Sequence, residues 1–209
     1  MSANRADDAS QRYRAILETA ARIICAKGYE GTSMQEIADA CKLTKAGLYH
    51  HIKNKEHLLI EIMSYGLDVF EEHVLANVRD IADPVERLKR CMDLNVKVVT
   101  QRWSKEITII LHENAALGDE GAQRINARKK AYVRFLESSI AEAIARGQFR
   151  PVNPTVAAFS FLGMVLWTYK WFRTDGALSD DEIAQGMVDV FFNGLLAPRQ
   201  TTSRLKEAK

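Results

Sequence analysis

The sequence predicts an all-α fold of about nine helices, three short ones followed by six mostly longer ones. Two observations lead to this prediction: capping residues that start and stop helices recur along the chain, and apolar residues recur at helical spacing between them. No segment has the pattern of a strand. With 209 residues, 47% of them hydrophobic and 27% charged, the chain has the composition of a folded protein and the length to bury a substantial core.

The first helix is expected over about Ser10–Lys27. Its apolar residues recur on one face, and Gly28 follows them as the left-handed residue that commonly ends a helix. Ser33, Thr44 and Asn54 are N-cap residues, because each has a side-chain oxygen for the unpaired amides of a helix start. The helices predicted after these caps are Ser33–Cys41, Thr44–Ile52 and Lys55–Val78.

The remaining helices are predicted by similar signals. Asp83 precedes a proline at the first helical position and a glutamate in the first turn, and Asn153 precedes a second such proline. Ser179 opens another capping box, and Gly147 ends an apolar series. The helices predicted from these signals are Pro84–Gln101, Glu120–Arg146, 154–172 and Ile183–Leu196, with a further helix around Ser104–Asn114.

Charge, cysteines and hydropathy narrow the class of protein. The net charge of +2 is too small to indicate nucleic-acid binding by itself, so the placement of individual basic residues must support that claim. The cysteines Cys25, Cys41 and Cys91 have no metal-binding spacing and are expected to be reduced. The longest apolar stretch, Val156–Tyr169, is shorter than the roughly 20 residues of a membrane span. No apolar leader follows the polar start, so we expect a cytoplasmic protein without membrane contact.

The second and third predicted helices form a helix-turn-helix pattern. Each is about two turns long, and only Lys42 and Leu43 separate the first helix from the cap of the next. The second helix of such a pair can enter a DNA major groove. On it, Leu48 and Ile52 lie four residues apart and are expected to face the core. The residues left for solvent or DNA are Lys45, Ala46, Gly47, Tyr49, His50 and His51.

Lys55 is predicted to bind a backbone phosphate. It begins the helix that Asn54 caps, so an ammonium group and the free amides of a positive helix end converge there. Lys45, near the start of the preceding helix, is placed to donate to guanine O6 or N7. On these residues alone, a structural three-helix packing remains an equal alternative. A metal site is not expected, because no carboxylate completes a ligand set around the histidines.

Three runs closely resemble the TetR family of one-component bacterial regulators. They are Gly28–Ala38, Thr44–Ile52 and Lys53–Leu59, nearly continuous over about 50 residues. The resemblance implies a homodimer that binds a double-stranded DNA operator through an N-terminal three-helix helix-turn-helix domain. The contact set that it implies is Thr32, Ser33, Thr44, Lys45, Ala46, Gly47, Tyr49, His50, His51 and Lys55.

The matching positions imply a role for each group of residues. Ser33, Tyr49 and Lys55 correspond to phosphate contacts, and His51 to a contact at the groove edge. Lys45, Ala46, Gly47 and His50 would face bases. The chain departs from the family at His50, where an aromatic residue is common.

The resemblance also implies a C-terminal helical domain for ligand binding and dimerisation. The last two predicted helices are apolar on more than one face, as expected if one face packs the core and another packs a partner. A thick monomeric core is the alternative. The predicted dimer interface is Phe159, Leu166, Met187, Val190, Phe191 and Leu195.

An effector pocket is expected among the fourth to seventh helices. Its candidate residues mix apolar surface with polar tips, although each is also typical of core or rim. They are Trp103, His112, Asn114, Arg128, Tyr132 and Trp167. The segments 147–151, 171–173 and 176–179 resemble regulators of fatty-acid and steroid breakdown, which implies an effector of the acyl-CoA type. Arg128 and its basic neighbours are candidates for its phosphates, with a solvated helix face as the alternative.

The predicted function is a ligand-responsive repressor that a small-molecule effector releases from a palindromic operator. The predicted division is a DNA-binding domain over residues 1–54, a ligand-binding and dimerisation domain over 55–197, and a flexible tail over 198–209. An enzyme is the main alternative, but the sequence has no H-E-x-x-H, G-x-S-x-G or phosphate-binding glycine loop. No cofactor is expected. A helical interaction module would leave Lys45, Tyr49 and Lys55 unexplained.

Overall fold

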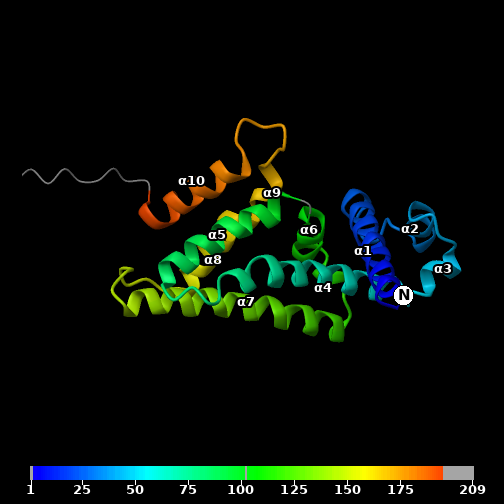
Figure 1. Ribbon diagram of the computed structural model, residues 1–209, viewed down its shortest axis with the longest axis horizontal. Helices are drawn as coiled ribbons and strands as arrows, with labels where there is room; N and C mark the ends of the chain where they lie inside the picture. The colour runs from blue at the N-terminus through cyan, green and yellow to red at the C-terminus, as the bar shows by residue number, and fades with distance from the viewer. Residues whose placement is uncertain (1, 102, 195–209) are drawn as a thin grey trace, which may run out of the picture.

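The structure is a computed structural model that describes residues 2–101 and 103–194, and side chains from residue 10 on. Within these ranges every regular element is a helix, which confirms the all-α prediction (Figure 1). The α-helices are α1 Ser2–Lys27, α2 Met34–Ala40, α3 Lys45–Tyr49, α4 Lys55–His73, α5 Pro84–Thr100, α6 Ser104–His112, α7 Asp119–Ala145, α8 Pro154–Leu166, α9 Thr168–Trp171 and α10 Asp180–Asn193. Two 3₁₀ turns, η1 Leu75–Asn77 and η2 Asn114–Ala116, follow α4 and α6.

The predicted caps form. Ser33 Oγ accepts from the Glu36 amide at 3.2 Å, and Asn54 Oδ1 accepts from the His57 amide at 2.7 Å. Ser179 and Glu182 close a reciprocal capping box at the start of α10. Gly28 has φ 77° and Gly147 has φ 70°, the left-handed conformation expected after α1 and α7.

Three predicted helices differ clearly from the structure, and two others differ at one end: α3 ends at Tyr49 rather than Ile52, and α10 begins at Asp180 rather than Ile183. The single helix expected over 154–172 is divided at Trp167 into α8 and α9, where the Thr168 hydroxyl donates to the Met164 carbonyl at 3.3 Å. Such bonds to the carbonyl four residues earlier often bend helices. The helix α4 ends at His73 rather than Val78, because the Asn77 side-chain amide donates to two of its last carbonyls.

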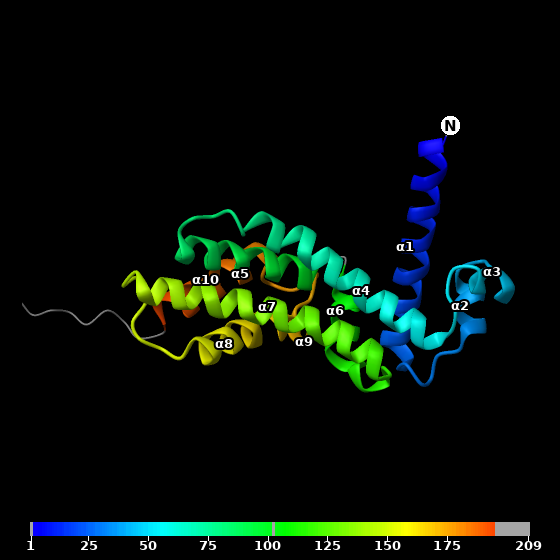
Figure 2. The ribbon, with the colours of Figure 1, turned by 90° about the horizontal axis from the view of Figure 1, so that it is seen from below.

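The third correction concerns α1, which begins at Ser2, eight residues earlier than predicted. No glycine or proline lies in residues 2–9 to stop the helix. Its N-terminal end projects from the body of the molecule in Figure 2. The predicted tail over 198–209 and the interface residue Leu195 lie outside the described residues.

The molecule is elongated, with α2 and α3 at one end and α5, α7, α8 and α10 gathered toward the other (Figures 1 and 2). The helix α4 runs between the two ends. The helix α5 packs against α7, α8 and α10, while α1 packs against α2, α4 and α6. Because α1 contacts α2 at one end of the molecule and also α4 and α6, it connects the helix-turn-helix to the rest of the chain.

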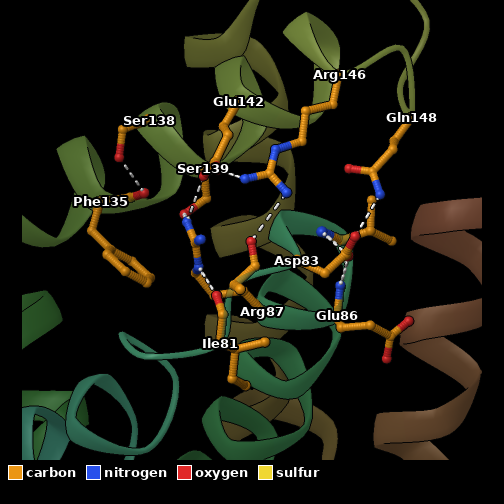
Figure 3. Close-up of polar contacts among 12 residues, drawn as sticks. Ile81, Asp83, Glu86, Arg87, Phe135, Ser138, Ser139, Glu142, Arg146 and Gln148 are labelled. Carbon is orange, nitrogen blue, oxygen red and sulfur yellow. Dashed lines mark hydrogen bonds and ion pairs between the residues drawn. The ribbon is translucent and has the colours of Figure 1, made fainter.

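A group of hydrogen bonds and ion pairs joins the start of α5 to the end of α7 (Figure 3). Arg87 donates to the Ile81 carbonyl and to Glu142 Oε2, both at 2.9 Å. Asp83 accepts from the amides that it caps and from Gln148 Nε2 at 2.5 Å. The Glu86 amide is the largest cause of the lowered pKa of Asp83, so this carboxylate stays ionised at neutral pH.

The side chains of Cys25, Cys41 and Cys91 are free thiols. Burial raises the pKa of Cys25 and of Cys91 to about 11, which keeps both protonated at neutral pH. Across residues 2–101 and 103–194, no helix has the length and apolar character to cross a membrane. In the same residues, no three His, Cys, Asp or Glu side chains are grouped as metal ligands.

Candidate DNA-reading surface and effector site

The short helix α3 presents one polar face to solvent. Thr44 caps it by accepting from the Gly47 amide at 3.0 Å, and Leu48 and Ile52 are fully buried beneath it. A Cβ at Gly47 would lie 3.2 Å from Thr44 Oγ1, so glycine leaves room for the cap. The exposed residues on and beside this helix are Thr44, Lys45, Ala46, Tyr49, His50 and His51. The exposure of these six residues agrees with the periodicity, while Gly47 is half-buried.

The turn before α3 has a conformation that the sequence did not reveal. Lys42 has φ 55°, the only positive φ among the described residues other than glycine. The turn is held by the Leu43 amide, which donates to the Ala38 carbonyl at 2.8 Å. A left-handed lysine costs about 1 kcal/mol, which the packing of α2 against α3 offsets. The turn therefore sets the angle at which α3 is presented.

Lys55 is held in place at the first residue of α4. Its Nζ lies 4.3 Å from the centroid of the Tyr29 ring and 3.4 Å from the Glu30 carbonyl oxygen. The ring and the carbonyl fix the ammonium beside the loop that leads to Ser33, the exposed cap of α2. In the described residues Lys55 has no carboxylate partner, so its charge is available to an anion. This arrangement suits a DNA phosphate.

Thr32 needs correction as a DNA contact. It is buried, and its hydroxyl donates to the Gly28 carbonyl at 2.9 Å. Its amide donates to the Tyr29 carbonyl, so the residue braces the turn between α1 and α2. The sequence alone did not separate Thr32 from its neighbour Ser33, because both are small hydroxyl residues beside a helix start.

The six candidate effector residues do not converge on one site. The Tyr132 hydroxyl exchanges hydrogen bonds with Asn95 at 2.8 and 3.0 Å, inside the core beside Cys91. Arg128 is paired with Asp68 at 2.8 Å, and Asn114 Oδ1 accepts from Lys129 at 3.2 Å. Of the remaining three, Trp103 packs its ring at a tilt against His73, while His112 bonds Tyr169, whose ring lies 6.4 Å from that of the exposed Trp167.

A cavity of about 650 Å³ lies elsewhere, between α1 and α4. Of the six candidates only Trp103 lines it. Tyr13 and Arg14 on α1 and Arg124 on α7 also line it, and sequence reasoning missed all three. The only sequence signal was the adjacent pair Tyr13 and Arg14 on the first helix. Periodicity does not distinguish such a pair from residues on a solvated helix face.

Exposed apolar side chains follow one face of α8 and continue onto α10. Phe159 is 57% exposed and Val190 is 38% exposed, the accessibility that the predicted interface requires. Leu166, Met187 and Phe191 are half-buried and pack against the core of their own subunit. Phe191 makes an edge contact with Phe161, with ring centroids 5.6 Å apart. Phe159 and Val190 are therefore the most available of the predicted interface residues.

The molecule carries a capped helix-turn-helix at one end of a helical bundle, and the ammonium of Lys55 is held beside it at the start of α4. This arrangement defines a DNA-binding regulator with a helical regulatory domain. Two family models match the chain. Residues 16–62 match the model of bacterial regulatory proteins of the tetR family, and residues 82–195 match the tetracyclin repressor-like C-terminal domain. The chain belongs to the TetR family of transcriptional regulators.

Several relatives are similar along most of the chain. The crystal structure of AibR in complex with isovaleryl coenzyme A and operator DNA is 65% identical, with a TM-score of 0.82, and covers 87% of this chain and 98% of that one. The TetR family regulator PfmR from Thermus thermophilus is 31% identical, with a TM-score of 0.80, and covers 87% and 99%. The transcriptional repressor KstR2 of Rhodococcus jostii is 26% identical over 92% of this chain and 97% of its own.

Proposed function

We propose that the chain is a homodimeric repressor that binds a palindromic operator and is released from it by a CoA thioester with a short branched acyl group. In this proposal residues 1–54 read DNA and residues 55–197 bind effector and partner. The observation that carries it is the exposed face of α3 beside the anchored Lys55, at the end of the molecule opposite the apolar face of α8 and α10.

The DNA-binding role rests on two lysines with different contacts: Lys45 with bases and Lys55 with a backbone phosphate. Lys45 is exposed at the first turn of α3, where a side chain reaches base edges in the major groove. Lys55 lies at a helix start, where amides and an ammonium together hold a phosphate. A two-fold dimer presents two such surfaces to the two halves of a palindrome.

The effector class rests on the similarity to AibR, which was crystallised with isovaleryl coenzyme A and operator DNA in one complex. Both ligands are present together in that protein, so they occupy separate sites there. The release proposed here is therefore a lowered operator affinity transmitted through the protein, and not a direct exclusion of DNA by the effector. Such a coupling is reciprocal, so operator DNA lowers effector affinity by the same factor. The effector must bind the DNA-competent and the released conformations unequally.

Thermal unfolding in the presence of isovaleryl-CoA tests the effector class. A ligand at 100 times its Kd stabilises the folded state by about 2.7 kcal/mol, which raises the Tm of a chain of this size by roughly 5 to 10 °C. Isovalerate and free CoA at the same concentration are the controls, and each is expected to shift the Tm by less than half as much. Equal shifts from all three, or no shift from any, would contradict the effector assignment.

We infer that the chain acts in the cytoplasm, where its DNA is located, and that it has no catalytic role. The sequence contains none of the hydrolase or nucleotide-binding motifs considered above. The buried polar cluster of Cys91, Asn95 and Tyr132 has its hydrogen bonds satisfied internally, and burial raises the pKa of the Tyr132 hydroxyl well above its usual value. It therefore serves the packing of α5 against α7.

A further inference from the structure

The helix α7 begins against the first turn of α4, beside Lys55. Its N-cap residue is Gly118, which has no side chain to cap the helix. The Gly118 amide donates to Glu56 Oε1 at 2.9 Å, and so joins the start of α7 to α4. In a capping box this amide is bonded by a glutamate of the same helix, so Glu56 takes that role from a neighbouring helix. One carboxylate therefore connects the N-terminus of α7 to the residue next to Lys55.

Two glycines allow the two helix starts to lie this close together. A Cβ at Gly118 would lie 2.8 Å from Glu56 Oε1, and a Cβ at Gly121 would lie 2.7 Å from Ile60 Cδ1. Both distances are shorter than packed side chains tolerate, so a larger residue at either position would displace its neighbour on α4. The contact between the start of α7 and the start of α4 therefore depends on both glycines.

The contact continues along one face of α4. Glu56, Ile60, Ser64 and Asp68 recur at four-residue spacing, which places them on the same side of the helix. Arg128 of α7 donates to the Ser64 carbonyl at 3.2 Å and pairs with Asp68 at 2.8 Å. The contacts advance in the same direction along both helices, which lie side by side in Figures 1 and 2. The helix α7 therefore supports α4 along most of its length.

The first turn of α4 is held from two directions. On one side the Lys55 ammonium lies against the Tyr29 ring and the Glu30 carbonyl, beside the helix-turn-helix. On the other side Glu56 bonds α7, which also packs against α5 and against α8, the helix that carries Phe159 of the predicted dimer interface. This turn is therefore the place where the DNA-reading end and the regulatory bundle meet through adjacent residues.

We propose that Glu56 is a positioning residue through which α7 sets the place of Lys55 on the operator, an inference that rests on the proposed function. A shift of α7 moves the Gly118 amide, and the Glu56 carboxylate carries the first turn of α4 with it. Lys55 then leaves its place beside the loop that leads to Ser33, and operator affinity falls. The effector needs no contact with DNA or with Lys55, because it acts by favouring one position of α7.

Fluorescence anisotropy of the full-length chain on operator DNA, with and without saturating isovaleryl-CoA, tests this role. The ratio of the two affinities is expected to be roughly tenfold or more in the wild type and to fall to within about threefold in Glu56→Ala. Glu56→Gln keeps an acceptor oxygen for the Gly118 amide and is expected to retain most of the ratio. Glu72→Ala removes an exposed carboxylate from the other end of α4 and is expected to leave the ratio unchanged.

Gly118→Pro deletes the same hydrogen bond from the other side, because proline has no amide hydrogen. Gly118 has φ −66° and Leu117 has ψ 137°, which are the conformations that proline and its preceding residue adopt. The variant is therefore expected to fold, with thermal unfolding as the check, and to lose the affinity ratio as Glu56→Ala does. A purely structural contact would lower operator affinity equally with and without isovaleryl-CoA. An unchanged ratio in either variant would overturn the proposal.

Hydrogen exchange provides a readout that does not depend on the effector. Because coupling is reciprocal, operator DNA is expected to slow exchange of the amides in residues 113–122, where none of the predicted DNA contacts lies. This slowing is expected to be lost in Glu56→Ala and kept in Glu56→Gln. Equal slowing in Glu56→Ala and in the wild type would overturn the role of Glu56.

The outcomes separate this inference from the proposed function. If the wild type responds to isovaleryl-CoA and Glu56→Ala keeps the wild-type ratio, the role of Glu56 is overturned while the proposed function stands. If the wild type binds operator DNA but not isovaleryl-CoA, the effector class is overturned, and the hydrogen-exchange comparison decides the role of Glu56. A wild-type chain that binds no operator overturns both.

Discussion

Lys55→Ala is expected to lower operator affinity by about 10- to 100-fold. Each subunit loses a contact between a charged group and a phosphate, worth about 1.5–3 kcal/mol when desolvated, and less at an exposed edge. The loss is expected to be similar for all DNA sequences, because a phosphate contact carries no sequence information. Since Tyr29 and the Glu30 carbonyl already hold the ammonium in place, the wild-type side chain needs little reordering on binding.

Fluorescence anisotropy over a range of salt concentrations measures this effect. A dimer that loses two phosphate contacts is expected to show a salt slope lower by about two. Lys130→Ala removes the same charge from an exposed position on α7 and is the matched control. Lys45→Ala is expected to relax base specificity instead. If Lys55→Ala binds DNA as tightly as Lys130→Ala does, Lys55 is not a phosphate anchor.

Phe159→Glu is expected to convert the dimer into a monomer and to lower operator affinity more than about 100-fold, because a monomer reads only half of a palindrome. In a two-fold interface the substitution places two carboxylates in one apolar contact. Burying an unpaired charge costs several kcal/mol per group. Phe159 is 57% exposed and packs little against its own subunit, so the fold itself is expected to survive.

Light scattering coupled to size-exclusion chromatography measures the mass of this variant. Leu111→Glu is the control, because Leu111 is also an exposed large apolar residue, at 37%, but lies on α6 away from the α8 and α10 face. Leu111→Glu is expected to remain a dimer. If Phe159→Glu also remains a dimer with unchanged operator affinity, the interface lies elsewhere.

Local capping chemistry made most of the fold predictable. Ser33, Asn54, Asp83 and Ser179 each start a helix where expected, because a cap depends only on the few residues around it. The break at Trp167 accompanies a hydrogen bond from the Thr168 hydroxyl to the Met164 carbonyl. A threonine at that position does not by itself predict that a helix ends, so the sequence pattern did not show the break. The left-handed Lys42 was hidden for a similar reason, since only tertiary packing imposes it.

The two candidate sites differed in how far the sequence predicted them. The α3 surface is local, so buried Leu48 and Ile52 determine by periodicity which neighbours are exposed. The cavity combines α1 and α4 with Arg124 of α7, more than 100 residues from Arg14 in sequence, and no spacing rule connects them. Arg128 resembled Arg124 in sequence context, yet Asp68 already neutralises it. Whether an arginine is already paired with a carboxylate depends on the tertiary structure, so the sequence could not distinguish Arg124 from Arg128.

The most direct test of the central claim is the affinity of the wild-type chain for promoter DNA of its own and neighbouring genes, measured by anisotropy with and without isovaleryl-CoA. We expect specific binding with a Kd of about 10⁻⁸ M or tighter, weakened by roughly tenfold or more at saturating isovaleryl-CoA and unchanged by isovalerate. Absence of specific binding to any of these promoters, or an affinity that isovaleryl-CoA leaves unchanged or increases, would contradict a repressor released by a CoA thioester.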